Sequence, residues 1–281
     1  MIAVASPDIS THSMPLVSVG IPTYNRPEGL RRTLGCMTGQ TYPNIEIIVS
    51  DNGSPDPRVA IVAKEFGARD SRIKYFRQAA NIGAMENFRF VLRQASGEYF
   101  MWAADDDEWD STFVETCVKS TTPECSVMTG FSTVFRANGT SHHNPIPRLT
   151  PLASPYANAR EYLRNMQPTL FYGIHPRQKV LFLLEGGTFD FYDCYFVLRL
   201  ILDSNYRTID SILYRAGVDA PEYQVKHARE GDGGRLHYWP FLKHATLAVV
   251  RCERLSVTEK LTLLIALGKK VLELKRHHGD T

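Results

Sequence analysis

Short apolar runs alternate with stretches of helical spacing over residues 17–104. Four of these runs have the apolar, β-branched character of strands: residues 17–21, 45–49, 73–76 and 99–104. Three stretches repeat their apolar residues at helical spacing: residues 27–37, 56–66 and 83–95. Strands that alternate with helices through short loops are typical of βαβ units. We therefore expect an α/β fold with a mostly parallel central sheet flanked by helices.

Polar loops follow the four predicted strands. They comprise residues 22–26, 51–54, 81–83 and 105–107. The carboxyl ends of parallel strands meet at one edge of a sheet, and ligands of such sheets bind there. The pattern therefore predicts one ligand site built from these four loops.

Three consecutive carboxylates, Asp105, Asp106 and Asp107, follow the apolar run 99–104. Like charges at the end of a buried strand cost free energy unless a cation neutralises them. Mg²⁺ or Mn²⁺ suits an all-oxygen site and usually also binds a substrate's phosphates. The triplet thus predicts a metal-assisted enzyme with a phosphorylated donor, and the alternative is a solvated acidic turn.

The second half of the chain is less regular. A strand is predicted over residues 126–135, a helix over 193–203 and a further strand over 206–215. Residues 137–155 contain four prolines and predict a loop, whereas the glycine-rich stretch 217–234 suits a mobile lid. A capping box at residues 256–259 predicts the start of a final helix.

Composition narrows the class of protein. Hydrophobic residues make up 43% of the 281 residues, which is enough for a sizeable core. The net charge of +2 gives no reason to predict a nucleic-acid partner. The five cysteines are scattered without a C-x-x-C pair, so we expect reduced thiols rather than disulfides or zinc. We see no signal peptide and no apolar run of membrane-spanning length, and predict a cytoplasmic location.

The motifs taken together resemble family 2 glycosyltransferases of the GT-A fold. The resemblance rests on residues 22–26, 49–54, 81–87 and 97–107, in this order and spacing. It covers residues 16 to about 120 and is fainter over 185–215. It implies a nucleotide-diphosphate sugar donor, a divalent metal and inversion at the anomeric carbon.

The resemblance also implies roles for individual residues. The residues expected to bind the nucleotide sugar are Pro22, Thr23, Tyr24, Arg26, Asp51, Asn52, Asn81, Gly83, Asp105 and Asp106. Among them, Asp51 would contact the base and Asp105 the ribose or sugar. Asp107 would ligate the metal, with Asp105 as a further ligand. Family members often carry a metal-binding histidine shortly after the later strand. Here Tyr214 and Arg215 are followed by alanine and glycine, so His227 is the candidate metal ligand in its place.

Inverting transfer needs a general base that takes the proton of the acceptor hydroxyl. The stretch 191–200 is similar to the family's acidic pair at a helix start, although Tyr192 replaces the first acid. Asp193 is therefore the predicted base, and Asp190 is the reserve. The alternative is that Asp193 only caps its helix.

We expect a GT-A domain over residues 1–235, with a nucleotide-sugar half at about 16–120 and an acceptor half at 121–235, and a C-terminal helical extension over 236–281. The predicted acceptor is a saccharide or a glycan-lipid hydroxyl. The basic C-terminal helix either lies on an anionic membrane surface or packs on its own domain or a twin subunit. Two other functions stay open: a nucleotidyltransferase, and a catalytically silent sugar- or nucleotide-binding protein.

Overall fold

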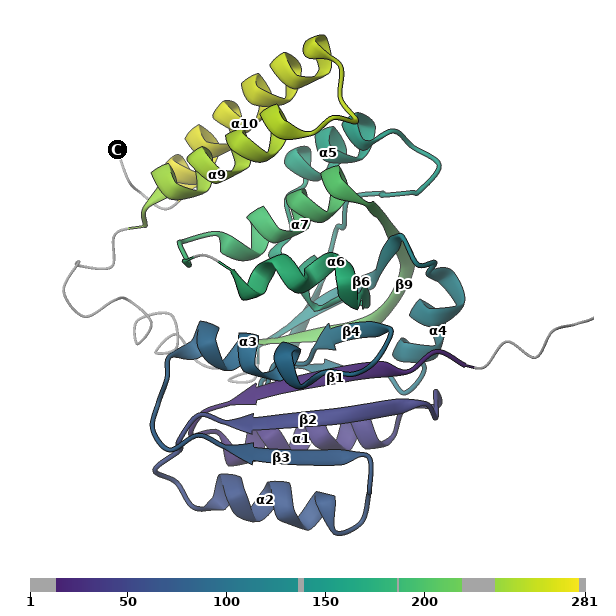
Figure 1. Ribbon diagram of the computed structural model, residues 1–281, viewed down its shortest axis with the longest axis vertical. Helices are drawn as coiled ribbons and strands as arrows, with labels where there is room; N and C mark the ends of the chain where they lie inside the picture. The colour runs from purple at the N-terminus through teal and green to yellow at the C-terminus, as the bar shows by residue number, and fades with distance from the viewer. Residues whose placement is uncertain (1–13, 136–138, 186, 219–235, 278–281) are drawn as a thin grey trace, which may run out of the picture.

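The computed structural model describes residues 14–135, 139–185, 187–218 and 236–277. Two sheets form the centre of the molecule (Figure 1). The first has the strand order β3-β2-β1-β4-β8, and the second has the order β5-β9-β6-β7. The predicted α/β class with a mostly parallel central sheet is confirmed.

The first sheet is built from the predicted strands. β1 (Val17–Thr23), β2 (Ile45–Asp51), β3 (Ile73–Arg77) and β4 (Tyr99–Trp102) are parallel, and the short β8 (His175–Pro176) is antiparallel to β4. All seven residues of β1 and of β2 are buried, because helices cover both faces of the sheet. Thr23 pairs with Asp51, and Asp51 with Arg77, so the strands end in register at one edge.

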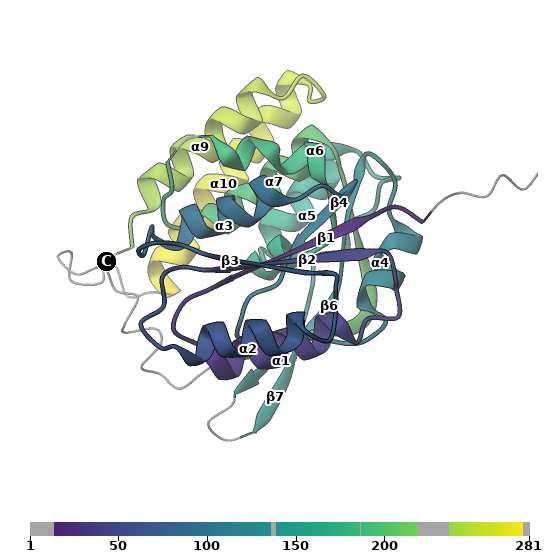
Figure 2. The ribbon, with the colours of Figure 1, turned by 60° about the horizontal axis from the view of Figure 1, so that its bottom comes forward.

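Helices lie on both faces of this sheet. α1 (Pro27–Thr38) and α2 (Arg58–Gly67) cover one face, and α3 (Ala84–Gln94) covers the other (Figure 2). Pro27 stands at the first turn of α1, where its missing N–H is no loss. Pro57 is the N-cap of α2, which has no side-chain cap hydrogen bond, and the Asp56 carboxylate one residue earlier accepts a hydrogen bond from the Arg58 N–H.

The second sheet belongs to the later half of the chain. It comprises β5 (Glu108–Trp109), β6 (Cys125–Phe135), β7 (Thr140–Asn144) and β9 (Asn205–Val218). β6 and β9 are parallel, and β5 is antiparallel to β9. Because β5 directly follows the aspartate triplet, the triplet lies where the two sheets meet. α4 (Phe113–Ser120) joins β5 to β6.

An aromatic cluster joins the first sheet to the helices of the second half. Trp102 of β4 stacks on Phe171 at a centroid distance of 4.5 Å and meets Phe196 edge-on. Phe171 belongs to the 3₁₀ helix η1 (Pro168–Tyr172), and Phe196 belongs to α7 (Tyr192–Asp203). Such ring contacts bury large apolar surfaces, so they fix α7 over the sheet.

Some predictions about the second half were wrong in detail. Residues 140–144, predicted as loop, form the edge strand β7, and α5 (Pro155–Arg164) begins at the proline that was expected to end the loop. β9 continues to Val218, into the stretch predicted as the start of a lid. The remaining lid residues 219–234, with His227, lie outside the described residues. The short helix α6 (Arg177–Val180) and the 3₁₀ helix η2 (Leu181–Leu184) complete this half.

The C-terminal extension is a helical hairpin. α9 (Tyr238–Arg251) packs on α7, and α10 (Val257–His277) packs on α5 and α9. The predicted capping box is present: Ser256 and Glu259 exchange hydrogen bonds at the start of α10. In the part of the chain that the structure describes, no helix has both the length and the apolar character for crossing a bilayer. The domain boundary at residue 235 stays a prediction.

Candidate functional site

A cavity of about 380 Å³ lies at the edge where β1, β2 and β4 end. It collects residues from the four predicted loops and from the start of α3. Its lining comprises Pro22, Thr23, Tyr24, Arg26, Asn52, Asn81, Gly83, Ala84, Asn87, Phe88 and Asp105. We call it the edge cavity. The predicted nucleotide-sugar residues are thus brought together, with the exception of Asp51 and Asp106, and their roles stay predictions.

Asp105 and Arg26 face each other in the edge cavity. Arg26 Nη1 donates to Asp105 Oδ1 at 3.0 Å and to Asp106 Oδ2 at 2.8 Å, and the Thr23 hydroxyl donates to Asp105 Oδ2 at 2.7 Å. Burial raises the pKa of Asp105 to about 6, although the charge of Arg26 opposes the shift. The site therefore holds a carboxylate whose ionisation is disfavoured even beside the Arg26 guanidinium.

A glycine on α1 lets the triplet approach the helix closely. A Cβ on Gly29 would lie 1.9 Å from the backbone oxygen of Asp105. Only a residue without a side chain fits this contact. Gly29 therefore determines how closely the aspartate loop packs on α1, which the sequence pattern did not reveal.

The amide side chains at the other end of the edge cavity are interlocked. Asn52 Nδ2 donates to Asn81 Oδ1 at 2.9 Å, and Asn52 Oδ1 accepts from the Ile82 N–H at 2.9 Å. Gly83 has a φ of 87°, a conformation that glycine adopts without strain. These contacts hold the loop after β3 against the loop after β2 and shape the cavity wall.

Asp51 lies outside the edge cavity. It is fully buried, its Oδ1 accepts from the Ser54 N–H at 2.8 Å, and its Oδ2 accepts from the Tyr75 hydroxyl at 2.9 Å. Arg77 lies 3.6 Å from the same carboxylate. In this structure Asp51 stabilises the loop after β2, and its predicted contact with a base stays a prediction.

Asp107 connects the triplet to β9. Its carboxylate accepts hydrogen bonds from the Tyr214 hydroxyl and, at 2.9 Å, from the Gly217 N–H. Burial and the neighbouring Asp106 raise the pKa of Asp107 to about 8. No local pattern in the sequence indicated Tyr214 as the partner, because the two residues are far apart in the chain.

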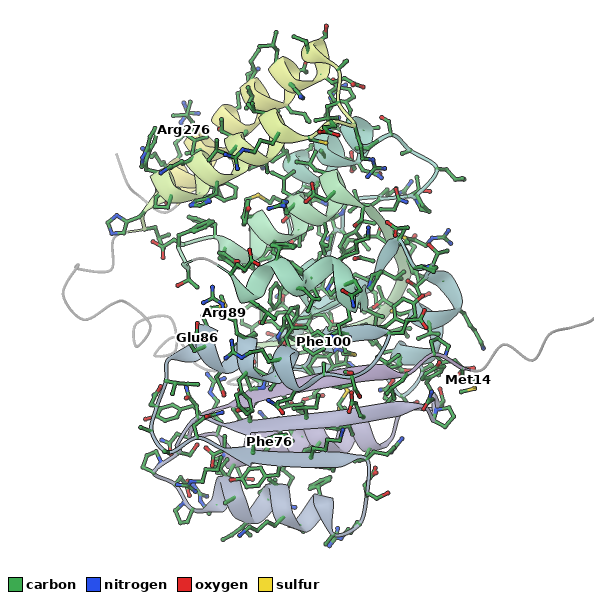
Figure 3. All side chains as sticks on the ribbon, in the orientation of Figure 1. Met14, Phe76, Glu86, Arg89, Phe100 and Arg276 are labelled. Atoms are coloured by element: carbon green, nitrogen blue, oxygen red, sulfur yellow. The ribbon has the colours of Figure 1, made fainter. Side chains whose placement is uncertain are left out.

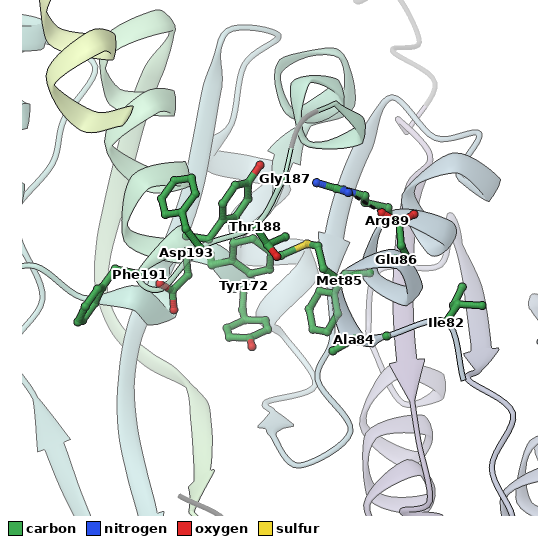
Figure 4. A pocket seen from close by; sticks show the side chains of 15 residues that line it. Ile82, Ala84, Met85, Glu86, Arg89, Tyr172, Gly187, Thr188, Phe191 and Asp193 are labelled. Atoms are coloured by element: carbon green, nitrogen blue, oxygen red, sulfur yellow. Dashed lines mark hydrogen bonds and ion pairs between the residues drawn. The ribbon is translucent and has the colours of Figure 1, made fainter. Parts of the chain in front are cut away.

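A second cavity, of about 710 Å³, adjoins the first. We call it the aromatic cavity, because Phe88, Phe171, Tyr172, Phe189, Phe191 and Tyr192 line it. Gly83, Ala84 and Phe88 line both cavities, so the two share a wall at the start of α3. Figure 4 shows Asp193 and Arg89 on opposite sides of the aromatic cavity, and Figure 3 places Arg89 beside Glu86 on α3.

Asp193 lies in the first turn of α7 and lines the aromatic cavity. Its Oδ1 accepts from the Cys194 N–H at 2.7 Å, and burial raises its pKa. Phe191, which directly precedes α7, has a left-handed φ of 63°, which is uncommon for a bulky side chain and marks a constrained helix start. Asp193 therefore accepts a backbone hydrogen bond in the first turn of α7 and also lines the cavity.

Asp190, the reserve base, does not line the aromatic cavity. Its Oδ2 accepts from the His237 N–H at 2.8 Å, just before α9. The geometry therefore separates the two candidates: Asp193 faces a cavity, whereas Asp190 connects the segment before α7 to the C-terminal hairpin.

The triplet has the donor chemistry that a divalent cation requires. Within the described residues, no three His, Cys, Asp or Glu side chains are grouped to hold a metal ion by themselves. One or two carboxylates plus substrate phosphates are, however, the usual ligands of Mg²⁺. Burial first, and the neighbouring Asp106 second, raise the pKa of Asp105 and of Asp107, and a bound cation would stabilise their ionised forms.

A family profile described as "Glycosyl transferase family 2" matches residues 18–200, which is more than half of the chain. The chain belongs to glycosyltransferase family 2. The predicted family is therefore confirmed. The matched segment begins at β1 and ends within α7, so it contains the loops that line the edge cavity as well as Asp193.

Curated relatives match about a third of this chain. A Campylobacter jejuni protein named GalNAc(5)-diNAcBac-PP-undecaprenol beta-1,3-glucosyltransferase is 40% identical over 96 residues, covering 34% of this chain and 31% of the relative. Streptococcus pneumoniae GlyA, named a glycosyltransferase, is 38% identical over 103 residues, covering 37% of this chain and 14% of the relative. The matched part is thus about a third or less of these proteins.

Solved structures show the same fold. Staphylococcus aureus TarS, residues 1–349 with UDP, has a TM-score of 0.70 at 17% identity and covers 94% of this chain and 73% of that chain. PcManGT is a mannosyltransferase from Pyrobaculum calidifontis in complex with GDP-Man and Mn²⁺. The match has a TM-score of 0.55 at 16% identity and covers 95% of this chain and 76% of that chain. These similarities confirm the GT-A fold of this family 2 chain.

Proposed function

We propose that this chain transfers a sugar from a nucleotide-diphosphate donor to a hydroxyl of a saccharide or glycan-lipid acceptor, with inversion at the anomeric carbon. The observation that carries the proposal is the shared wall of the two cavities at Gly83, Ala84 and Phe88. A donor in the edge cavity would thereby present its sugar toward the aromatic cavity. Family membership supports this reading, as do the neighbouring structures solved with UDP and with GDP-Man.

Asp193 is the proposed general base. Its carboxylate faces the aromatic cavity, and burial raises its pKa toward the working range of a base. An acceptor hydroxyl near Asp193 would lose its proton as the bond to the anomeric carbon forms, and the nucleoside diphosphate would leave on the opposite face.

The aromatic walls suit a saccharide acceptor. The cavity combines Tyr172, Phe189 and Tyr192 with the charged Glu86 and Arg89. Ring faces carry negative potential and attract the polarised C–H groups of a sugar, while charged groups bind its hydroxyls. The relative named for a polyprenol-linked acceptor makes a glycan-lipid a reasonable member of this acceptor class, and a role in polysaccharide biosynthesis would follow.

Asp107, with Asp105 as a further ligand, would hold Mn²⁺ or Mg²⁺ together with the donor's diphosphate. The ion would neutralise the charge that develops on the leaving diphosphate. Arg26, which already contacts Asp105 and Asp106, would orient these carboxylates and bind a phosphate oxygen. The neighbouring structure solved with GDP-Man and Mn²⁺ supports a divalent ion.

The experiment measures release of nucleoside diphosphate from UDP-, GDP-, dTDP- and CDP-sugars with Mn²⁺, with and without saccharide and polyprenol-linked acceptors. Asp193→Asn should lower acceptor-dependent transfer by about 10²- to 10⁴-fold and leave donor binding intact. Asp190→Asn is the matched control, because Asp190 lies outside the cavity lining, and should retain transfer. Equal rates in wild type and Asp193→Asn would overturn the assignment of the base.

The same assay separates the two other functions. A nucleotidyltransferase would release pyrophosphate and form a nucleotide-linked product, whereas a glycosyltransferase releases the nucleoside diphosphate. A catalytically silent binding protein would bind donor without turnover under any acceptor condition. Either of these two outcomes would replace the proposal.

A further inference from the structure

The C-terminal hairpin presents an apolar outer face. α9 buries one side on α7, and α10 buries one side on α5, so the opposite sides of both helices face away from the domain (Figure 1). On α10 the exposed side carries Val257, Leu261, Ile265 and Leu272, with exposed fractions of 56–76%. On α9 it carries Trp239, Leu247 and Val250, and Trp239 is 71% exposed. We call these seven side chains the hairpin face.

The α10 residues of the hairpin face share one side of that helix. Val257, Leu261 and Ile265 are four residues apart and Leu272 follows two turns later, so all four lie on one stripe of α10. Buried residues of the same helix, such as Leu263 and Leu267, lie on the other side. A helix with apolar residues on both sides can pack one side on its own domain. The other apolar side is then exposed and can bind a separate surface.

The two hairpin helices are rich in basic side chains. Residues 238–277 contain eight Lys and Arg side chains and three Glu, a net charge of +5. Among the described residues, no carboxylate forms an ion pair with Lys243, Arg251, Lys269 or Arg276, although Lys270 is paired with Glu273. Figure 3 shows Arg276 near the end of α10, far from Phe76 on β3. Apolar and positive groups are thus concentrated at one end of the molecule.

We propose that the hairpin face lies on an anionic lipid surface, with both helices in the plane of the interface. Exposed apolar side chains would enter the headgroup region, Trp239 would sit at its boundary, and the surrounding cations would meet lipid phosphates. Two copies of the chain would instead bring net charges of +5 together, so charge complementarity favours lipid over self-association.

Docking would also orient the aromatic cavity. Phe189 stacks on His244 of α9 at a centroid distance of 4.6 Å, and Phe191 stacks on Tyr238 of α9 at 5.2 Å. Both phenylalanines line the cavity that contains Asp193. The hairpin is therefore in direct contact with the wall of the aromatic cavity. If that cavity binds the acceptor, which rests on the proposed function, a docked hairpin would hold the cavity near a membrane-bound acceptor.

The test is sedimentation of the whole chain with phosphatidylcholine vesicles, with and without phosphatidylglycerol. The wild-type chain should bind the anionic vesicles and should dissociate from them as the salt concentration rises. Leu261→Ser with Ile265→Ser should weaken binding by at least about tenfold. Lys269→Gln with Arg276→Gln should weaken binding to anionic vesicles by about thirtyfold, since each basic residue near such a surface contributes about fivefold.

The matched control is Ile61→Ser with Leu152→Ser, because both side chains are exposed but lie outside the hairpin. This pair should bind vesicles as wild type does, and all variants should keep the wild-type melting temperature. Equal binding to neutral and anionic vesicles, or binding unaffected by the hairpin substitutions, would overturn the proposal. A dimer in light scattering that the same substitutions dissociate would overturn it too, since a second copy would then cover the face.

Vesicle binding needs neither donor nor acceptor, so its result is independent of the proposed activity. If the chain does not bind vesicles but still transfers sugar to a water-soluble saccharide, only the proposed lipid-binding surface is rejected. If the chain binds vesicles but transfers no sugar to any acceptor, only the proposed activity is rejected.

Discussion

The hydroxyl of Tyr214 on β9 donates a hydrogen bond to the carboxylate of Asp107 in the loop after β4. Both side chains are buried, with exposed fractions of 1% and 5%. This bond, with that from the Gly217 N–H, links the aspartate triplet to the second sheet. The relationship explains how residues from the two halves of the chain form one site.

Replacing Tyr214 with phenylalanine should destabilise the protein by about 1–3 kcal/mol, because a buried carboxylate oxygen loses its donor. The free energy of unfolding in urea is the measurement. Tyr24→Phe is the control: its ring is 43% exposed, and we expect a change within about 0.5 kcal/mol. Equal stability of Tyr214→Phe and wild type would show that the bond contributes nothing.

Substituting Gly29 tests the close contact between α1 and the triplet. A Cβ would meet the Asp105 backbone oxygen, so Gly29→Ala should destabilise by about 1–3 kcal/mol and weaken nucleotide binding. Gly35→Ala on the same helix is the control, because a Cβ there would meet no neighbouring atom within 4 Å, and it should stabilise by up to about 1 kcal/mol. Similar effects from both substitutions would contradict the packing argument.

The stability of the free protein should fall as pH rises from about 4 to 8. In this window folded Asp107, whose pKa is raised to about 8, keeps a proton that the unfolded chain loses, and Asp105 does the same up to about pH 6. Each such proton gives a slope of at most about 1.4 kcal/mol per pH unit. Asp107→Asn should flatten the slope in urea unfolding across this range; an unchanged slope would rule out Asp107 as its source.

The acidic limb of the pH–rate profile reports the proposed base. Burial raises the pKa of Asp193, and the base must be ionised, so kcat/KM should fall at a pH above the ordinary carboxyl value of about 4. Asp190→Asn should keep this limb, and Asp193→Asn should lose it along with most of the rate. A limb that persists in Asp193→Asn would assign it to another group.

Much of the edge cavity could be predicted from local pattern. β1, β2, β3 and β4 were predicted because each is a short apolar run ended by a polar loop, and the parallel arrangement places those loops together. The GT-A fold and the family followed from the same loops. Asp193 lines a cavity at the start of the predicted helix, and its role as the base stays a prediction.

Other features depend on contacts between distant segments. β7 has the polar sequence Thr-Ser-His-His-Asn and forms a strand only because β6 supplies its hydrogen-bond partners. The hydrogen bonds that Ser54 and Tyr75 donate to the two oxygens of Asp51 are another example, because Tyr75 comes from the next strand of the sheet. The start of α5 did have a local signal, Ser154 before Pro155, where the Ser154 hydroxyl accepts from the Ala157 N–H.

The most direct test of the central claim is calorimetric titration of the chain with UDP, GDP, dTDP and CDP in the presence and absence of Mn²⁺. The account predicts that at least one of them binds at a ratio of one per chain, that omitting Mn²⁺ weakens it, and that Asp107→Asn weakens it by at least about tenfold. Absence of binding by all four nucleotides with Mn²⁺ present, in a folded protein, would contradict it.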